Sequence, residues 1–591
     1  MVQTLRMVSQ VSNSLCEIEN RFQFHLGKCC KVRSERDQAF FSKHLFGKIC
    51  VYRRKIVRVF TPTLSVLASS QPPDPKTPSP KTPMPTKTVA KVDDLQDGEM
   101  KQVEVGDTDV LLTRIDGDYH AVGAHCVHYG APLANGVLSG NTVICPWHHA
   151  VYNVTDGEHI EPPGRDCLNK FEVNIEGDEV VVTVPDGAEE HRQPDFGGAA
   201  EGDEREFLIL GAGAAGSFAA ETLRRAGYTG KLAMITYEDD PPYDRPNLSK
   251  AYLAGDAEPD WLPLREKSFY KAFDIDLECG RAVERVEVGD KKIIFDDGET
   301  RTYDALLLAT GGTPRTLDIP GTELDQVMLL RNVADADAII AAAEDARKAV
   351  VIGSSFIGME VAASLTSRDI DVSVASIDRI PFERVLGERV GEYFLNMHRD
   401  NGVEFYLERG VERIEERDGS RVVVLDDGTE LEADLVVMGV GVRPRTSYLS
   451  GIALNDDASV TVDATMKAAD GLWAAGDIAR FPHPKTGESI RIEHWRLAEQ
   501  HGKIAALNMA GEHKEYDEVP FFWTRQFDTS VKYVGYAHDW DEINIEGDIG
   551  EGKFIARYLK DGRVLAACGT MGAKLTEIHD QMRRGEEVAP A

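Results

Sequence analysis

The chain has 591 residues, of which 42% are apolar and 28% charged, a composition typical of several globular domains. No apolar run approaches the roughly 18 residues that cross a bilayer, which excludes a transmembrane helix. The formal net charge is −33, but Lys and Arg outnumber Asp and Glu by 16 to 5 in residues 1–92, so the remainder carries −44. A surface this acidic is predicted to repel nucleic acid and anionic membranes.

Residues 1–88 are predicted to form an N-terminal extension without a packed core. Residues 72–88 contain seven prolines in seventeen positions, which indicates an extended linker. The basic stretch before it is rich in Ser, Phe and Arg, which is typical of a mitochondrial import sequence and equally of an unstructured extension. Nine cysteines without paired spacing indicate a reducing compartment. We therefore predict a cytoplasmic protein, with a mitochondrial location as the alternative.

Residues 89–185 contain short β-rich runs such as DVLLTRIDGDYHAVG, which predict a small antiparallel β-domain. Two loops in this domain each carry one Cys and one His: Cys126 with His128, and Cys145 with His148. Zinc fingers place their cysteines in one hairpin and their histidines on one helix. The division seen here fits a two-iron cluster in which the cysteines bind one iron and the histidines the other. A single zinc ion is the alternative.

The sequences CVHYGAPLANG and CPWHHAVYNV resemble the cluster-binding loops of Rieske [2Fe-2S] domains. High-potential Rieske proteins add a disulfide between the loops and a serine that donates to the cluster, where this chain has Ala131, Trp147 and Ala150. The resemblance therefore implies a potential near the low end of the Rieske range, on the order of −150 mV. His125 and His149 flank the ligands and are interpreted as loop residues.

A second predicted linker, residues 186–204, is acidic and Gly-rich, and a dinucleotide-binding unit follows it. The stretch EFLILGAGAAGSFAAETLRRAG reads as a strand, a glycine turn and a helix. Gly211, Gly213 and Gly216 would let the helix N-terminus approach a pyrophosphate. Glu238 ends the next predicted strand, where a carboxylate can accept hydrogen bonds from a ribose.

The stretch KAVVIGSSFIGMEVAASLTSRD repeats the pattern of strand, glycine turn and helix. Its glycine turn has the three residues Gly353, Ser355 and Gly358. The next predicted strand ends at Ser376, where an acidic residue would normally select NADH. Asp378 and Arg379 follow, so either NADH or NADPH is predicted. Two such folds in one chain usually place a flavin against a nicotinamide, and a coincidental second glycine motif is the alternative.

Residues 205–584 resemble the FAD-dependent NAD(P)H oxidoreductases of the ferredoxin reductase and apoptosis-inducing-factor type. The resemblance is carried by seven motifs in the family's order: GAGAAG, YDRPNLSK, LLLATGGTPR, GSSFIGMEVAASL, VVMGVGVRP, GLWAAGDIA and EHWRLAEQHGKIAALNM. Disulfide reductases of this fold carry a C-x-x-x-x-C pair beside the flavin, but residues 206–278 contain no cysteine. The flavin's electrons are therefore expected to leave by another route.

The resemblance also implies the residues of the cofactor sites. FAD would be bound by Gly211, Gly213, Gly216, Glu238, Arg245, Lys250, Thr310, Gly311 and Asp477. The nicotinamide site would contain Gly353, Gly358 and Glu360, with Glu360 able to pair with Lys250. Glu493, His494 and Trp523 would lie beside the flavin ring. A surface or capping role is the alternative for the polar residues, above all for His494. No residue is expected to act as a catalytic acid, base or nucleophile, since the cofactors carry the chemistry.

The predicted fold is multidomain: a small antiparallel β Rieske domain, two α/β dinucleotide-binding domains and a C-terminal α+β domain. The predicted bounds after the β-domain are 205–325 and 447–515 for the FAD domain, 326–446 for the NAD(P)H domain and 516–591 for the C-terminal domain. The combined order resembles apoptosis-inducing-factor-like proteins with an N-terminal Rieske domain. It implies electron transfer from NAD(P)H through FAD and the [2Fe-2S] cluster to an unidentified acceptor, either a small protein or a small molecule. The alternatives are a redox-sensing signalling flavoprotein and a reductase component for an oxygenase.

Overall fold

The computed structural model describes residues 85–590. The predicted import sequence and most of the proline-rich linker lie outside these residues. No helix within residues 85–590 is both long and apolar enough to cross a membrane. The free cysteines of this part of the chain are Cys126, Cys145, Cys167, Cys279 and Cys568.

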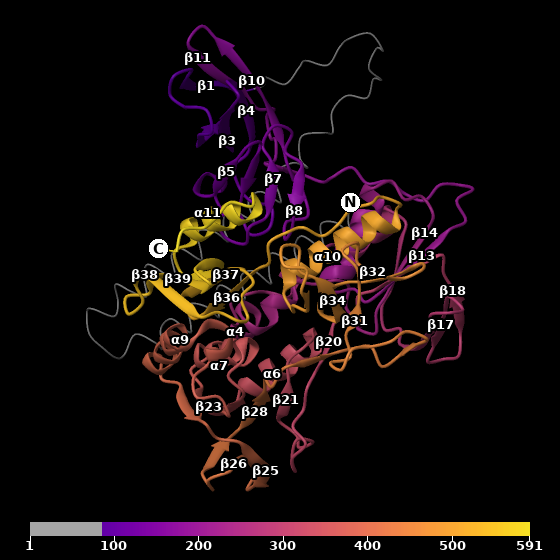
Figure 1. Cartoon of the computed structure of the whole chain (residues 1–591), viewed down its shortest axis with the longest axis vertical. Helices are drawn as coiled ribbons and strands as arrows, with labels where there is room; N and C mark the ends of the chain where they lie inside the picture. Colours follow the sequence, from indigo (N-terminus) through magenta and orange to yellow (C-terminus); the bar gives the residue numbers. More distant parts are fainter. Residues whose placement is uncertain (1–84, 591) are drawn as a thin grey trace, which may run out of the picture. The chain divides into compact units, whose positions relative to one another are not determined.

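The N-terminal β-domain consists mainly of two antiparallel sheets (Figure 1). The larger has the order β1-β11-β10-β4-β3-β2, with bounds Thr86–Lys91, Glu179–Thr183, Lys170–Glu176, Asp118–Gly123, Thr108–Ile115 and Met100–Val105. The smaller has the order β5-β6-β7-β8, with bounds Val137–Ser139, Thr142–Ile144, Val151–Asn153 and His159–Glu161. Alternate residues of β3 and β4 face opposite sides, so Leu111 and Val122 join the core around Cys126 and Cys145, while Leu112 joins the other core. The short pair β9 (Cys167–Leu168) and β12 (His191–Arg192) leads out of the domain.

The first α/β fold is built from two separate stretches of the chain. Its sheet has the order β15-β14-β13-β19-β33-β32, with bounds Ile275–Glu278, Lys231–Ile235, Glu206–Leu210, Ala305–Leu308, Leu472–Ala474 and Lys467–Ala469. The run of apolar residues in β13 is buried on both faces, as parallel sheets require. Helix α3 (Ala214–Arg225) follows β13 directly, and α10 (Trp495–Met509) from the second stretch packs along it.

The second α/β fold lies between these stretches and has a parallel sheet of order β21-β28-β22-β23-β24. Its strands are Val327–Leu329, Leu435–Met438, Lys348–Ile352, Asp371–Ser376 and Glu404–Leu407. Its helices are α6 (Val333–Ala343), α7 (Phe356–Thr366), α8 (Glu383–Leu386) and α9 (Glu388–Asp400). The antiparallel strands β25 (Val411–Arg417), β26 (Ser420–Leu425) and β27 (Glu430–Ala433) add a small flanking sheet.

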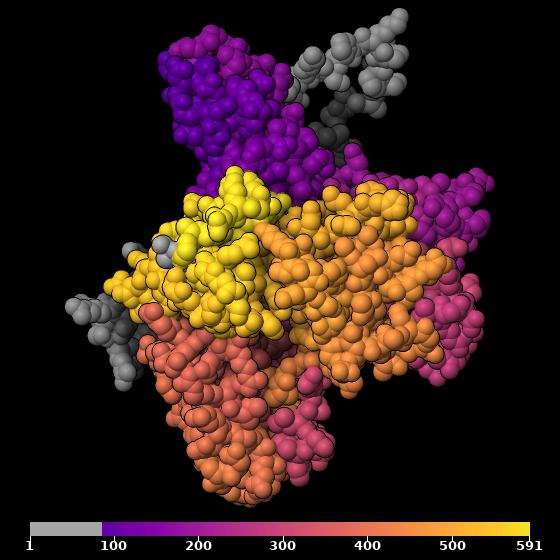
Figure 2. Space-filling model, in the orientation of Figure 1, coloured from indigo at the N-terminus to yellow at the C-terminus, as the bar shows by residue number. Residues whose placement is uncertain are grey.

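The C-terminal domain is an antiparallel sheet covered by one helix. The sheet has the order β36-β37-β40-β39-β38, with bounds Phe521–Gln526, Thr529–Gly535, Arg563–Gly569, Lys553–Lys560 and Glu542–Asp548. Helix α11 (Gly572–Arg583) packs on β37 and β40 and also contacts β5 of the N-terminal domain. Figure 2 shows the corresponding indigo and yellow surfaces in contact.

Buried charges join the N-terminal domain to the first α/β fold. Arg165 donates to Glu221 of α3 at 2.7 Å and to Glu499 of α10 at 2.9 Å, and all three side chains are at least nine-tenths buried. Arg265 forms a second ion pair with Glu221 at 2.9 Å. Burial raises the pKa of Glu499 to about 8 and outweighs the opposing attraction of Arg165. If the two domains separated, Arg165 and Glu499 would lose each other as partners, although the docked structure has removed both from water.

We predict that Arg165→Met strongly destabilises the docked domains, because it removes the arginine partner of the buried Glu499 and one of the two arginine partners of Glu221. Breaking a buried pair in this way costs about 3–5 kcal/mol. The exposed pair Lys91–Asp178 provides the control, and Lys91→Met should cost about 1 kcal/mol or less. Urea denaturation followed by circular dichroism measures both, and equal midpoints for the two variants would contradict the assigned role of Arg165.

Candidate functional site

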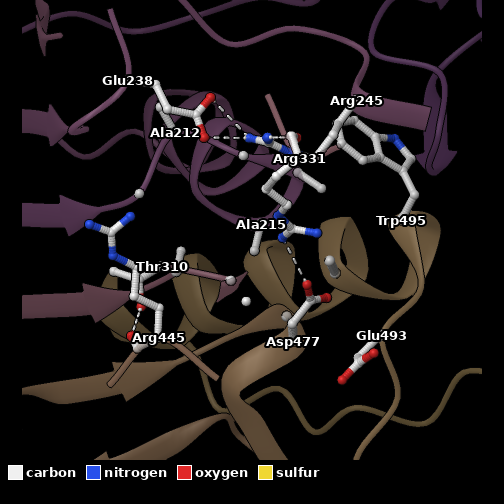
Figure 3. A pocket seen from close by; sticks show the side chains of 18 of the residues that line it. Ala212, Ala215, Glu238, Arg245, Thr310, Arg331, Arg445, Asp477, Glu493 and Trp495 are labelled. Carbon is white, nitrogen blue, oxygen red and sulfur yellow. Dashed lines mark hydrogen bonds and ion pairs between the residues drawn. The ribbon is translucent and has the colours of Figure 1, made fainter. Parts of the chain in front are cut away.

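A pocket of about 310 Å³ is lined by both α/β folds and by the C-terminal domain. Figure 3 shows part of this lining. Twelve of the predicted cofactor residues line it: Gly211, Gly213, Glu238, Arg245, Lys250, Thr310, Gly311, Glu360, Asp477, Glu493, His494 and Trp523. Gly216, Gly353 and Gly358 are not among the residues that line it. The pocket is thus assembled from segments that lie more than 300 residues apart in the sequence.

The first glycine turn has three different geometric requirements. Gly211 has a φ of 104°, and a β-carbon there would lie 2.2 Å from the Ala309 carbonyl oxygen. A β-carbon at Gly216 would lie 1.8 Å from the carbonyl oxygen of Gly211. A β-carbon at Gly213 would meet no atom of the described residues within 4 Å, so this glycine borders open space. The turn therefore leaves the backbone at the start of α3 accessible to a phosphate group.

Glu238 lies at the pocket end of β14 and is held by two neighbours. Its carboxylate accepts hydrogen bonds from the Tyr243 hydroxyl at 2.6 Å and from Arg245 at 3.0 Å. Two of the residues predicted to bind FAD, Glu238 and Arg245, are therefore in direct contact. The ion pair with Arg245 holds the Glu238 carboxylate in one orientation at the pocket (Figure 3).

Two arginines that the sequence analysis did not identify also border the pocket. Arg331 pairs with Asp477 at 3.2 Å, and Arg445 lies over the Tyr237 ring at 3.7 Å (Figure 3). Thr310 donates its hydroxyl hydrogen to the Arg445 carbonyl oxygen at 2.7 Å. Two guanidinium groups on this wall are a suitable environment for a negatively charged pyrophosphate.

Lys250 and Glu360 form the ion pair that the sequence analysis predicted, at 2.8 Å. Glu360 lies on α7 of the second α/β fold, and its carboxylate also accepts from Ser249 at 2.5 Å and Thr524 at 2.6 Å. Three parts of the chain thus meet at one buried carboxylate. This contact ties the second α/β fold and the C-terminal domain to the wall of the pocket.

His494 lines the pocket, and one of its two ring nitrogens, the buried Nδ1 atom, has no hydrogen-bond partner among residues 85–590. Burial lowers the pKa of His494 to about 3, so the ring is neutral at physiological pH. Burial also raises the pKa of the neighbouring Glu493. His494, Phe522 and Trp523 give the lining flat aromatic side chains, which suit the flat heteroaromatic ring of a flavin.

The second glycine turn resembles the first in geometry. Gly353 also has a φ of 104°, and a β-carbon there would lie 2.5 Å from the Gly439 carbonyl oxygen. A β-carbon at Gly358 would lie 2.3 Å from the Gly353 carbonyl oxygen. Ser355 replaces the middle glycine and donates its hydroxyl hydrogen to the Gly439 carbonyl oxygen at 2.8 Å. The serine side chain therefore bonds to the loop, and α7 begins beside the pocket with Phe356 and Ile357 in the lining.

The two Cys/His loops bring the two histidines together and the two cysteines together. The Nδ1 atoms of His128 and His148 are 3.1 Å apart, and the Cys126 and Cys145 thiols are close enough for each to shift the pKa of the other. Within residues 85–590 these four side chains do not form a group of three ligand atoms that one ion could share. Burial lowers the pKa of His128 to about 3, which keeps the imidazole neutral and able to bind metal. A cysteine pair apart from a histidine pair fits a two-iron cluster and not a single zinc ion.

The cluster loops lie against the pocket wall. The His148 ring centroid is 4.4 Å from that of Trp523, which lines the pocket, and the His128 centroid is 6.4 Å from it. Tyr129 follows His128 and donates its hydroxyl hydrogen to Asp244, in the segment that also carries Arg245. The second cluster loop is therefore linked to the pocket through two contacts, since His148 contacts Trp523 and Trp523 lines the pocket.

Three known families match three successive parts of the chain. Residues 205–502 match the pyridine nucleotide-disulphide oxidoreductase family, residues 86–172 the Rieske [2Fe-2S] domain and residues 521–589 the reductase C-terminal domain. The chain belongs to the pyridine nucleotide-disulphide oxidoreductase family. As a member with a Rieske domain, it is an FAD-dependent NAD(P)H oxidoreductase with a [2Fe-2S] centre.

Similar proteins share this organisation in whole or in part. Apoptosis-inducing factor 3 of Mus musculus is 39% identical over 511 residues, which are 84% of this chain and 84% of that protein. Rhodocoxin reductase of Rhodococcus erythropolis is 33% identical over 59% of this chain and 82% of its own. The crystal structure of a ferredoxin reductase from Rhodopseudomonas palustris is 31% identical, with a TM-score of 0.63, over 66% of this chain and 96% of its own.

Contacts between the docked domains could not be predicted from the sequence. His149, interpreted as a loop residue, is fully buried, and its Nδ1 atom lies 2.7 Å from Nδ1 of His579 in α11. Arg165, Arg331 and His579 carry no motif. Arg331 follows an apolar strand at a cofactor-binding edge, and this position was the one available signal.

We predict that Gly216→Ala and Gly213→Ala both reduce FAD retention, but for different reasons. Gly216→Ala forces the start of α3 apart and should cost at least about 1 kcal/mol of stability. Gly213→Ala meets no protein atom nearby, so the apoprotein should keep its melting temperature while the flavin-to-protein absorbance ratio falls. Unchanged flavin content in Gly213→Ala would contradict a cofactor in that space. Cluster content, measured as bound iron, serves as the control in both variants.

Proposed function

We propose that one chain performs the complete electron relay, from NAD(P)H through FAD to its own Rieske cluster and then to a one-electron acceptor. The single observation that supports this most is the 4.4 Å contact between His148 and Trp523, because one is a proposed cluster ligand and the other lines the proposed flavin pocket. Bound FAD would supply the exchange between two-electron and one-electron chemistry.

In this proposal the chain's own residues position the cofactors. Gly211, Gly213 and Gly216 admit the pyrophosphate, Arg331 holds the Asp477 carboxylate, and Lys250 with Glu360 orders the wall beside the flavin ring. His494 offers a neutral ring nitrogen, and Phe522 packs on it at 4.4 Å, which excludes water from that side. We assign Cys126 and Cys145 to one iron and His128 and His148 to the other. The domain bounds predicted from the sequence are part of the same proposal, with two corrections: β1 begins at Thr86, inside the predicted extension, and β12 lies inside the predicted linker 186–204.

The partner is proposed to be a one-electron acceptor, and a ferredoxin-type protein is the first candidate class. The support comes from relatives named as ferredoxin reductases and from the solved putidaredoxin reductase–putidaredoxin complex, which is 29% identical to this chain with a TM-score of 0.62. Supply of electrons to an oxygenase is the second candidate for the same reason. We propose a cytoplasmic location; the alternative mitochondrial signal falls outside residues 85–590.

Anaerobic titration of the holoprotein with NADH tests the relay. We expect bleaching of the flavin absorbance, followed by the rhombic EPR signal of a reduced Rieske cluster. Direct reduction with dithionite provides the control for cluster content. A cluster that dithionite reduces but NADH leaves oxidised would overturn the relay and favour the sensor function.

The nucleotide-binding edge of the second α/β fold supports a preference for NADH. Strand β23 ends at Ser376, and the Asp378 carboxylate accepts hydrogen bonds from Ser354 at 3.2 Å and from Ser376 at 3.3 Å. Arg379 is paired with Glu383 and Glu388. Ile377 is 72% exposed and offers apolar surface beside this carboxylate. Asp378 also pairs with the exposed Arg384 at 3.3 Å, and its other carboxylate oxygen is held by the two serines. A carboxylate fixed in this way accepts from ribose hydroxyls, so we propose that Asp378 takes the role of the missing acidic residue at 376.

We predict that Asp378→Asn raises the ratio of kcat/KM for NADPH to that for NADH by at least about tenfold, or ~1.4 kcal/mol. The change removes the negative charge and keeps the side-chain shape. Asp371→Asn, at the exposed start of the same strand, should leave the ratio unchanged. Steady-state kinetics with ferricyanide measure both variants, and equal ratios in the two would contradict the role of Asp378.

A further inference from the structure

The C-terminal domain contacts three of four consecutive residues in the second cluster loop, Pro146 to His149. Trp523 packs on His148, and Lys532 donates a hydrogen bond to the Pro146 carbonyl oxygen. Phe521 stacks on His149 with ring centroids 3.9 Å apart and planes at 21°. The contacts lie on both sides of the proposed iron ligand His148 and on the ligand itself.

These contacts come from one face of the C-terminal sheet. Trp523 of β36 pairs directly with Lys532 of β37 in the antiparallel ladder, so their side chains lie on the same face. Phe521 is two residues from Trp523 and shares that face, and the two rings are stacked 6.0 Å apart. The sheet therefore holds Lys532, Trp523 and Phe521 at fixed positions, where they contact loop residues 146, 148 and 149 respectively.

Helix α11 completes the contact around His149. The His149 Nδ1 atom lies 2.7 Å from Nδ1 of His579, and its Nε2 atom lies 3.2 Å from the Thr576 hydroxyl. His149, Thr576 and His579 are all fully buried. The φ of 58° at His149 puts the backbone in the left-handed region, and both His148 and His149 contact the same domain. Both ring nitrogens of a buried histidine are thus hydrogen-bonded to α11.

We propose that Phe521, Trp523, Lys532, Thr576 and His579 form a docking face for the second cluster loop of the same chain, and that this face sets the position of the cluster for electron transfer. The docking rests on the contacts above, whereas its effect on electron transfer rests on the proposed relay. His149, Thr576 and His579 are positioning residues, because they act through the loop and do not touch the cofactor pocket.

The double variant Thr576→Val/His579→Leu tests the docking face, since it removes both hydrogen bonds to His149 while keeping similar side-chain sizes. In the oxidised holoprotein, hydrogen–deuterium exchange of residues 145–150 should rise at least about tenfold. Lys532→Met, on a different element, should act in the same direction. Glu577→Gln, on the exposed side of α11, is the matched control, and His579→Gln should restore much of the protection because it keeps a hydrogen-bonding group.

Anaerobic stopped-flow measurement with NADH distinguishes a misplaced cluster loop from a general loss of structure in the double variant. In the double variant the flavin should be reduced at the wild-type rate, while cluster reduction slows at least about tenfold with unchanged iron content. The rate should not depend on protein concentration, because donor and acceptor belong to one chain; a concentration-dependent rate would overturn docking within the chain. Wild-type exchange together with wild-type cluster reduction in the double variant would overturn the docking face. If exchange rises but NADH does not reduce the wild-type cluster, the docking face stands and the relay fails.

Discussion

A buried charge, the guanidinium of Arg165, holds the Rieske domain against the first α/β fold. It lies between Glu221 of α3 and Glu499 of α10, the two helices that pack together in the first α/β fold. Charges removed from water keep a low energy only while their partners stay in place. The same docking brings the His148 ring onto Trp523 at the wall of the cofactor pocket. A structural ion pair and a proposed electron path are thus consequences of one arrangement.

Segments that are distant in the sequence form the pocket, and the α/β fold or C-terminal sheet to which each segment belongs determines its position. The glycine turns follow buried parallel strands, so their amide groups lie at the carboxyl edge of each sheet, where nucleotides bind. Glu360 reaches Lys250, Ser249 and Thr524 from the second fold. Because one carboxylate joins three parts of the chain, movement of any part would disturb the others.

The structure also separates two kinds of histidine within one loop. His148 is half-buried at the edge of its domain and has a ring nitrogen directed to His128, as a metal pair requires. His149 is fully buried, and both of its ring nitrogens are hydrogen-bonded to residues of α11. Two adjacent histidines are therefore proposed to have different roles: His148 binds iron, and His149 docks the loop on the C-terminal domain.

The sequence alone determined the local chemistry of this protein. The glycine spacing, the Cys/His division and the alternation of strand and helix each depend on residues close together in the chain, so they indicated the two nucleotide folds and the two-iron cluster. The Lys250–Glu360 pair was also accessible, because a family resemblance places both residues. Only the tertiary structure decided where Arg165, Arg331, His149 and His579 find their partners, because those partners lie on other elements that are distant in the sequence. Docking of the β-domain belongs to this second group, since it depends on buried polar and charged groups contributed by segments up to 430 residues apart.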